Sequence, residues 1–323
     1  MANLLDTTIT GRLGLPVTSQ SGSVNNLWFV NNKLNYSYTS TVFSTTGALI
    51  TARYSLAGAG TQPAALAFGG ITGPARVTCT EAYNGSTWSS CSGLITARCS
   101  LAGTGISNSA LAMGGNVTTA PGNSNATELF NGTSWSTCAS LITARQILAG
   151  AGNSGATLAI GGFPITCVEL FNGVSWSTST ALPQSSCSNS AVGTTTAALN
   201  MAGNPASYTT QAYNGTAWSQ FPGIRLGRIS ATAAGCQNAA LLMGGNITGT
   251  CVVCTENFNG GVWFTAGPLI TARNTSAGGG TSTAPIVFGG FVTPTQSSCT
   301  ERATQGTVVC VFSGSVVAPP YSY

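Results

Sequence analysis

Arginine and glutamate are the residues of this chain whose types and spacing could support chemistry. The 323 residues include ten Lys and Arg, six Asp and Glu, and no His. Arginine recurs at Arg12, Arg53, Arg98, Arg145, Arg228 and Arg273, and glutamate at Glu81, Glu128, Glu169, Glu256 and Glu301. Such groups could bind an anionic ligand or act as catalytic acids. A residue needed once for chemistry has no reason to recur once per repeat, so we expect these side chains to pair or to cap strand ends within or between repeats.

The composition argues against several classes of function. Without His the chain lacks the commonest general base and the commonest neutral metal ligand, and six acids leave few carboxylate pairs. The net charge of +4 comes from scattered Lys and Arg, which form no basic stripe for nucleic acid. No apolar stretch is long enough to span a bilayer, and the start of the chain is not typical of a secretory signal. We therefore predict no enzymatic activity, no metal, no cofactor, no nucleic-acid partner and no membrane insertion.

An internal repeat dominates the sequence. The motif Leu-Ile-Thr-Ala-Arg ends at Arg53, Arg98, Arg145 and Arg273, and a glycine pair ends seventeen residues after each of these arginines and after Arg228. A second signature follows in five units: Glu or Gln, an aromatic residue, Asn-Gly and then Trp. The last unit keeps Glu301 but has Ala303 and Val308 at the aromatic positions. The N-terminal copy and the copy that starts near Ser186 are diverged. Seven units result, at about 9–48, 49–93, 94–140, 141–181, 182–223, 224–268 and 269–313, with 1–8 as an N-terminal attachment segment and 314–323 as a C-terminal tail.

Each unit is predicted to form four short strands, which in the second unit are roughly 55–61, 64–68, 77–83 and 87–91. Asn-Gly between two apolar runs predicts a two-residue type I′ hairpin turn, in which both residues have positive φ. Glycine recurs in the first strand of six units, as at Gly60, where neighbouring blades of a propeller would crowd a β-carbon near the axis.

The arginine, the apolar run that ends in Gly-Gly, and the spaced aromatic residue and Trp together resemble a kelch repeat. The resemblance covers about residues 9–313 and implies an all-β fold, a β-propeller with one four-stranded blade per unit. Seven units imply a seven-bladed ring. In the alternative, the N-terminal unit forms no blade of its own and its strands complete a six-bladed ring.

The tryptophans and cysteines are expected to be structural. The hairpin tryptophans are interpreted as wedges between blades rather than as sugar-stacking platforms: Trp88, Trp135, Trp176, Trp218 and Trp263. Cys79 and Cys91 lie symmetrically about an Asn-Gly turn, so a disulfide between them is possible, but other units do not repeat the pairing. Cys251 and Cys254 form a lone CxxC with no His, which does not indicate zinc. Buried thiols are the expected state of most cysteines.

The units differ in length mainly in the connections between their second and third strands. Variation on one face of a repeat array is typical of a partner-binding surface. The candidate binding residues on this face are Arg76, Asn123, Phe163, Tyr208 and Arg225. The alternative interpretation is that they are ordinary solvated loop residues.

The amino-acid sequence of the repeats is also similar to that of kelch-like arrays in virion structural proteins of marine tailed bacteriophages. Residues 80–88, TEAYNGSTW, and 64–70, AALAFGG, carry this likeness, and residues 7–16, TTITGRLGLP, resemble lead-in segments of phage appendage proteins. The likeness implies a structural protein of a tail fibre or of the capsid surface, located in the virion, with other virion proteins as partners and a host-surface glycan or protein as a further candidate. The alternative is a soluble propeller that binds a glycan or a protein.

Overall fold

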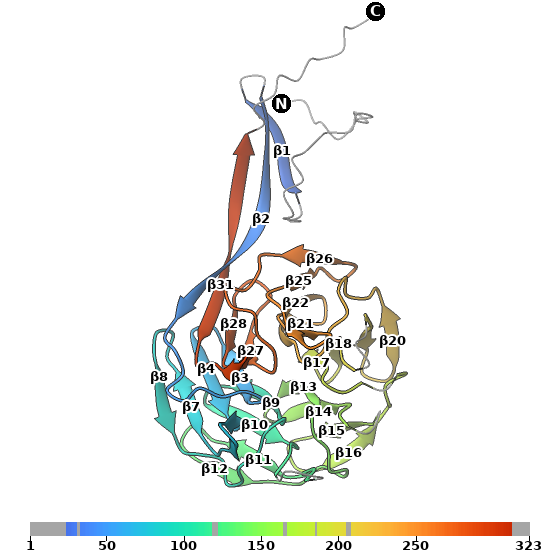
Figure 1. The fold of residues 1–323 in the computed structure, drawn as a ribbon. Coiled ribbons are helices and arrows are strands. Elements are labelled where there is room, and N and C mark those ends of the chain that lie inside the picture. Colours follow the sequence, from blue (N-terminus) through green and yellow to red (C-terminus); the bar gives the residue numbers. More distant parts are fainter. Residues whose placement is uncertain are drawn as a thin grey trace, which may run out of the picture.

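The computed structural model describes residues 24–30, 33–117, 122–163, 167–184, 186–204 and 208–311, and the side chains among them between residues 40 and 305. Every regular element in these ranges is a β-strand. No helix that could cross a membrane occurs among these residues. Six sheets surround a common axis and form the blades of a propeller (Figure 1).

Blades 1 to 5 each consist of four antiparallel strands that follow one another in the chain, from the axis outward. Blade 1 contains β3 (Ala57–Thr61), β4 (Ala64–Phe68), β7 (Thr80–Tyr83) and β8 (Trp88–Cys91). Blade 2 contains β9 (Ala102–Ile106), β10 (Ser109–Met113), β11 (Thr127–Phe130) and β12 (Trp135–Thr137). Blade 3 contains β13 (Ala149–Asn153), β14 (Ala156–Ile160), β15 (Val168–Phe171) and β16 (Trp176–Ser179). Blade 4 contains β17 (Ser190–Thr194), β18 (Ala197–Met201), β19 (Thr210–Tyr213) and β20 (Trp218–Phe221). Blade 5 contains β21 (Thr232–Cys236), β22 (Ala239–Met243), β25 (Thr255–Phe258) and β26 (Trp263–Ala266).

Blade 6 combines strands from both ends of the described chain. It contains β27 (Ala277–Gly280), β28 (Pro285–Phe288), β31 (Thr300–Val311) and, as its outer strand, β2 (Lys33–Thr46). β2 and β31 pair from Thr46 opposite Thr300 to Asn35 opposite Val311. β1 (Val24–Val30) pairs with the far part of β2, and these strands project from the rim of the ring (Figure 1).

The expectation of seven blades is therefore wrong, and the six-bladed alternative is confirmed. The N-terminal unit contributes one strand to the ring rather than four. Phe43 lies opposite Ala303 in the register in which Trp88 lies opposite Tyr83, so Phe43 takes the place of the missing hairpin tryptophan. Pairing the two ends of the chain within one sheet leaves the ring without an open blade.

The second strand of each blade is buried because neighbouring blades cover both of its faces. Leu66 and Phe68 in β4 are fully buried, and the ring of Phe68 lies 5.0 Å from the ring of Trp135 in blade 2. Trp135 Nε1 donates a hydrogen bond of 3.1 Å to Thr80 Oγ1 in blade 1. Trp88 repeats the arrangement and donates to Thr300 Oγ1 in blade 6 at 3.0 Å. These tryptophans thus lie between blades, where each joins apolar burial to a satisfied N–H group.

The Asn-Gly turns differ from the predicted type. Only the glycine has positive φ, 93° at Gly85, and the loop between β7 and β8 runs from Asn84 to Thr87. Asn84 Oδ1 accepts hydrogen bonds from the backbone N–H groups of Ser86 and Thr87 at 3.0 and 2.9 Å. The asparagine therefore acts through its side chain, as a local turn cap, and needs no left-handed backbone.

The predicted reason for glycine in the first strand also needs correction. A β-carbon on Gly60 would lie 2.3 Å from the carbonyl oxygen of Ala64 in the same blade, and its φ is +99°. The glycine that a neighbouring blade crowds is two residues earlier, in the first strands of blades 1, 2, 3 and 6. At Gly103 a β-carbon would lie 2.6 Å from the carbonyl oxygen of Gly58 in blade 1.

Three short hairpins extend the connections between second and third strands in blades 1, 5 and 6. They are β5 (Ile71–Thr72) with β6 (Ala75–Arg76), β23 (Asn246–Ile247) with β24 (Thr250–Cys251), and β29 (Phe291–Val292) with β30 (Thr295–Gln296). The connections that lead from each outer strand to the next inner strand meet them through isolated bridges, such as Tyr54 with Ile71. Both sets of connections therefore form one face of the propeller, which we call the connection face.

Candidate functional site

The recurring arginines and glutamates form buried ion pairs, one in each of five blades. The pairs are Arg53–Glu81, Arg98–Glu128, Arg145–Glu169, Arg228–Glu256 and Arg273–Glu301, at 3.0, 2.9, 3.1, 2.6 and 2.5 Å. The arginine side chains are fully buried. In each pair the arginine lies on the connection that leads into a blade, and the glutamate lies on the third strand of that same blade.

In blade 2 the geometry shows what each pair holds together. Glu128 accepts hydrogen bonds from the backbone N–H groups of Ile95 and Thr96 at 2.7 and 3.4 Å, which fixes the connection to the blade. Arg98 Nη1 donates to the carbonyl oxygens of Gly114 and Ala126 at 2.8 and 2.6 Å. The pair therefore ties the connection to two strands of the blade, and these bonds offset part of the cost of burying two charges.

Burial also changes the proton affinity of these arginines. It lowers the pKa of Arg53, Arg98 and Arg228, and the facing glutamate acts in the opposite direction in each case. The Nε atom of all five paired arginines is buried without a hydrogen-bond partner among the described protein atoms. None of these arginines or glutamates lines the pockets along the axis. Their charges tie each connection to its own blade and do not converge on one site.

Blade 4 replaces the ion pair with an uncharged network. Ser186 stands at the arginine position and Gln211 at the glutamate position, so both charges are absent together. Asn189 Nδ2 donates to Asn200 Oδ1 at 2.5 Å, and Asn200 Nδ2 donates to Gln211 Oε1 at 3.2 Å. Replacing both partners avoids the unpaired buried charge that a single change would leave.

Around the axis, one residue from each connection forms a closed ring of backbone hydrogen bonds. Ser55 N–H donates to the carbonyl of Thr275 at 2.8 Å, Ser100 donates to Ser55 at 2.8 Å, and the series continues around the ring until Thr275 donates to Ser230 at 3.0 Å. The six members are Ser55, Ser100, Ile147, Ser188, Ser230 and Thr275. All six have positive φ, between 48° and 54°, a backbone conformation that is strained for residues other than glycine. The ring stabilises this conformation because the backbone N–H group of every member donates a hydrogen bond.

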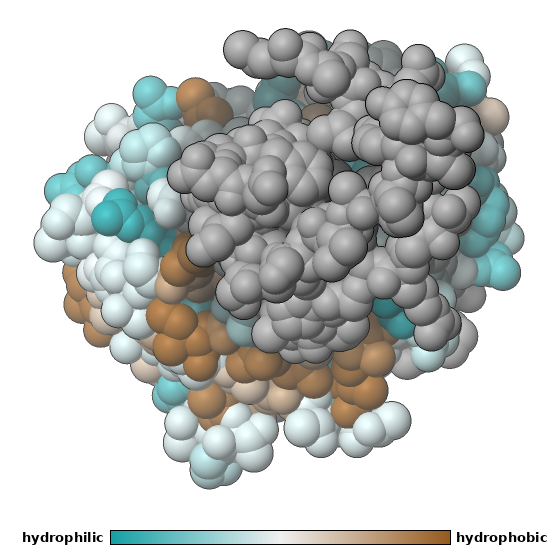
Figure 2. Space-filling view, turned by 90° about the horizontal axis from the view of Figure 1, so that it is seen from above, coloured by the Kyte–Doolittle hydropathy of each residue, from teal (hydrophilic) through white to brown (hydrophobic). Residues whose placement is uncertain are grey.

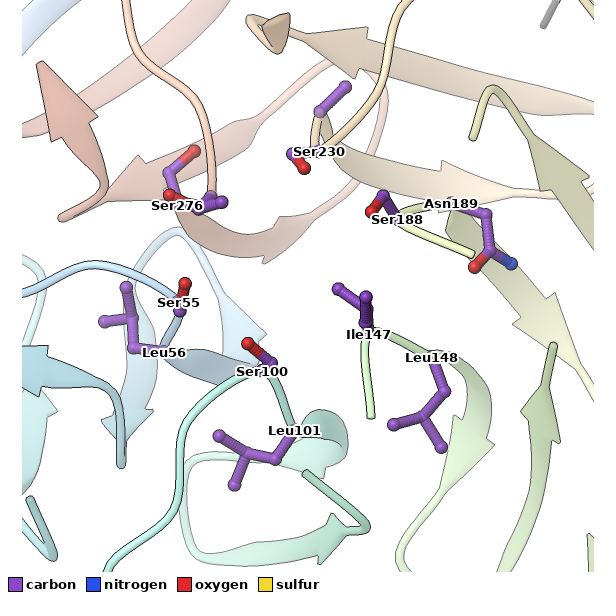
Figure 3. Close-up of a pocket in the computed structure, with 12 residues that line it drawn as sticks. Ser55, Leu56, Ser100, Leu101, Ile147, Leu148, Ser188, Asn189, Ser230 and Ser276 are labelled. Carbon is purple, nitrogen blue, oxygen red and sulfur yellow. The ribbon is translucent and has the colours of Figure 1, made fainter. Parts of the chain in front are cut away.

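This ring surrounds the mouth of a pocket of ≈ 90 Å³ on the connection face (Figure 3). The residue that follows each ring member forms the lower wall: Leu56, Leu101, Leu148, Asn189, Ala231 and Ser276. Blades 1 to 3 thus contribute apolar side chains, while blades 4 and 6 contribute an amide and a hydroxyl. We call this feature the axial pocket.

Two further pockets, of ≈ 130 and ≈ 140 Å³, continue along the axis below the axial pocket. Glycine and alanine of the inner strands make up most of their walls, together with Thr104, Ser190, Val192 and a few other side chains. No acidic or basic side chain is among the described residues that line any of the three pockets. The axis can therefore offer hydroxyl, amide and backbone groups to a ligand, but no formal charge.

The five predicted binding residues lie in the connections and are spread over several blades. Arg76 donates to Asn116 Oδ1 from Nε and Nη2 at 3.0 and 2.6 Å, and Asn116 forms a backbone bridge with Asn123. These contacts bring Arg76 and Asn123 to the same part of the face, between blades 1 and 2.

The other three candidates lie on blades 3 to 5. The carbonyl of Tyr208 accepts a hydrogen bond from Ile224 N–H, beside Arg225, whose own N–H donates to Glu256. The side chains of Tyr208 and Phe163 are 58% and 54% exposed. Phe163 N–H donates to Gln146, next to the axial ring. The structure therefore does not gather all five residues into one site, and their binding role stays a prediction.

Sequence reasoning missed the axial ring and Asn189. A signal was present, because a small polar residue stands two positions after the recurring arginine in most units, as at Ser55, Ser100 and Ser230. The ring position carries no conspicuous chemistry, however, and its role depends on six blades meeting at one axis.

The cysteines do not form the possible disulfide. Cys79 and Cys91 are both free, and the register places Cys91 opposite Thr80, so the two thiols lie on different rungs of the hairpin. Of the ten cysteines whose side chains the structure describes, Cys99 alone is buried, so the expectation of mostly buried thiols is wrong. The described residues contain no cluster of His, Cys, Asp or Glu that could hold a metal ion.

The sheet order and the closure by β2 define this protein as a six-bladed β-propeller. No family model matches the chain, and a comparison with curated proteins finds no match. Among solved structures, one described as "Structure of YjhT" is similar, with a TM-score of 0.66 and 12% sequence identity, over 82% of this chain and 99% of that chain. At this identity the likeness shows the fold alone.

Proposed function

We propose that this protein is a non-enzymatic structural component of a virion, in a tail fibre or on the capsid surface, which uses one propeller face for assembly or for adhesion to the host. The observation that carries the proposal is the placement of charge. The paired arginines and glutamates are buried within the blades. The axial pocket and the two pockets below it are lined by uncharged groups. Such an arrangement supports binding rather than acid–base catalysis.

The connection face offers repeated apolar contacts to a partner. Ile50, Ile95, Ile142 and Ile270 occupy the same place in four connections, and their side chains are between 55% and 59% exposed. Figure 2 looks at the molecule from above Figure 1, and so at the rim of the ring rather than down the axis, and there too hydrophobic residues gather in a cluster among residues of intermediate hydropathy. Exposed apolar groups that repeat on one face are typical of an interaction surface.

The projecting strands support attachment at the rim. β1, β2 and β31 leave the ring at blade 6, to the side of the axis (Figure 1). A connection through this part of the chain would leave the connection face accessible. The proposed attachment segment, residues 1–8, lies outside the described residues.

The kelch-type motifs and the likeness to phage virion proteins supply the biological context of the proposal. A surface with few charges also suits a particle exposed to high salt, because few of its contacts depend on interactions that ions would screen. Low net charge leaves little repulsion between neighbouring copies in an assembly.

Antibody labelling of purified virus particles tests the proposal. Antibodies raised against this protein should label a fibre, tail or shell uniformly in negative-stain images, and the chain should be present among the particle proteins by mass spectrometry. Particles that carry neither the label nor the chain would contradict a virion role.

The alternative is a soluble propeller that binds a glycan or a protein, and the axial pocket is the observation that favours it. Binding of the isolated protein to a glycan array, together with the absence of the chain from particles, would support this alternative. Replacement of Phe163 or Tyr208 by Ala tests whether the predicted loop residues contribute to that binding.

A further inference from the structure

We infer that the axial pocket binds the edge of an uncharged saccharide, with Asn189 Oδ1 as the acceptor of one of its hydroxyl groups. This inference rests on the proposed adhesive function and names the ligand class of the connection face. It depends on one unsatisfied atom, on the polarity of the pocket wall and on the size of the opening.

The unsatisfied atom belongs to Asn189. Its side chain lines the axial pocket, the residue is only 8% exposed, and Oδ1 is buried without a hydrogen-bond partner among the described protein atoms. Its Nδ2 is engaged by Asn200, which fixes the direction of the amide. In Figure 3 the oxygen lies on the side of the amide nearer the opening. A buried acceptor of this kind favours a ligand that brings an O–H or N–H donor.

Asn189 is peculiar to blade 4. The same position holds leucine in blades 1 to 3, alanine in blade 5 and serine in blade 6. The amide is therefore not a repeat residue retained for packing. It is the inner end of the network that replaces the ion pair, and that network connects the pocket to Gln211.

The wall of the axial pocket disfavours a charged ligand and favours a ligand that carries both apolar and polar groups. Leu56, Leu101 and Leu148 form an apolar half, while hydroxyl groups such as those of Ser188 and Ser230 surround the mouth (Figure 3). A charged ligand would lose hydration without meeting an opposite charge. A saccharide edge presents both C–H groups and hydroxyl groups, which match the two halves of the wall.

The size of the pocket limits how much of the ligand enters. A volume of ≈ 90 Å³ is several times the roughly 10–15 Å³ that a single water needs, but far smaller than a pocket that encloses a whole ligand. One hydroxymethyl group or one edge of a ring would fit, while the rest of the sugar would lie on the connection face. Phe163, whose backbone N–H is bonded to the carbonyl of Gln146 next to the ring, has an exposed aromatic side chain on the connection face.

Saturation-transfer NMR and titration with free monosaccharides test the inference on the full chain. The probes are glucose, galactose, mannose and N-acetylglucosamine, with glucuronate and glucosamine as charged counterparts. At least one neutral sugar should bind saturably, and its charged counterparts should bind more weakly. N189L should reduce the affinity about tenfold, as expected for loss of one hydrogen bond to a buried acceptor.

A second variant and a control guard against effects on folding. S188A removes a hydroxyl at the mouth while leaving the backbone ring in place, and should also weaken binding. S89A removes a hydroxyl from the exposed outer strand of blade 1 and should leave binding unchanged.

Two results would overturn the inference. One is the absence of saturable binding by every neutral sugar. The other is binding that survives both N189L and S188A, which would place the sugar elsewhere. Neither result bears on the labelling of particles, so failure of this inference is distinguishable from failure of the virion proposal.

Discussion

Removing one partner of a buried ion pair should destabilise the propeller far more than replacing the pair with the uncharged network of blade 4. In blade 2, Arg98 and Glu128 are 0% and 1% exposed. R98S would leave the Glu128 carboxylate buried with only backbone N–H donors, and breaking a buried pair in this way costs about 3–5 kcal/mol. The same reasoning applies to E128Q, which leaves the guanidinium without its counter-charge.

Blade 4 supplies the matched variant. Its Ser186, Asn189, Asn200 and Gln211 correspond to Arg98, Leu101, Ala112 and Glu128 in blade 2. The quadruple variant R98S/L101N/A112N/E128Q should therefore recover most of the loss and cost about 1–2 kcal/mol, mainly from imperfect repacking. R302S, which removes an arginine that is not fully buried, should cost less than about 1 kcal/mol.

Urea unfolding followed by tryptophan fluorescence and by circular dichroism measures these differences. Coincident transitions by the two probes permit free energies to be compared, and equal slopes show that the denatured states are alike. If R98S loses no more stability than the quadruple variant, the ion pair does not have the role assigned to it.

Three further perturbations follow from the geometry. W135F should lower the free energy of unfolding by about 1–2 kcal/mol, because it removes the hydrogen bond to Thr80. The double variant W135F/T80V should show no additional loss in urea unfolding, and an additive loss would argue against the bond. G103A should lower the melting temperature sharply or prevent folding, since its β-carbon meets the backbone of blade 1; an unchanged melting temperature would contradict the close approach. Burial raises the pKa of the Cys167 thiol, so alkylation mapped by mass spectrometry should reach it only at higher pH than exposed Cys236; equal modification of both at pH 8 would refute this order.

The raised pKa of Cys167 also makes the stability of the fold depend on pH. The folded pKa of Cys167 lies above its ordinary value, so the folded chain holds this proton longer than the unfolded chain as the pH rises. Its contribution is fully present below the ordinary thiol pKa and is lost as the pH rises through the folded pKa. Stability should therefore decline in the alkaline range, and C167A should reduce that decline.

The repeat made the fold predictable because every blade solves the same packing problem. The spacing of arginine, glycine pair, glutamate and tryptophan predicted four-stranded blades, and the strands expected near 64–68 and 87–91 agree closely with β4 and β8. The number of blades was not predictable from the count of units alone. The diverged N-terminal unit supplies a single strand, whereas the other units each supply the strands of a blade. What distinguishes the two cases is which strands pair, and β2 pairs with β31, which is far away in the sequence.

The candidate site was less accessible to sequence reasoning. Loop variability indicated Arg76, Asn123 and Phe163, which lie in connections of unequal length. The axial pocket depends on residues such as Ser188 and Asn189, which look ordinary in a chain rich in Ser, Thr and Asn. Their importance follows from position, because each blade brings only one or two of them to the axis.

By itself the sequence determined the all-β class and the repeated blade, because these depend on spacing within one unit, and it indicated that arginine and glutamate are structural while leaving open whether they pair or cap strand ends. Only the tertiary structure decided that β2 completes blade 6, that six connections close a hydrogen-bonded ring, and that blade 4 turns an amide oxygen toward the axis. These features depend on how the units meet around the axis, and the pairing of residues in different units cannot be derived from the spacing within one unit.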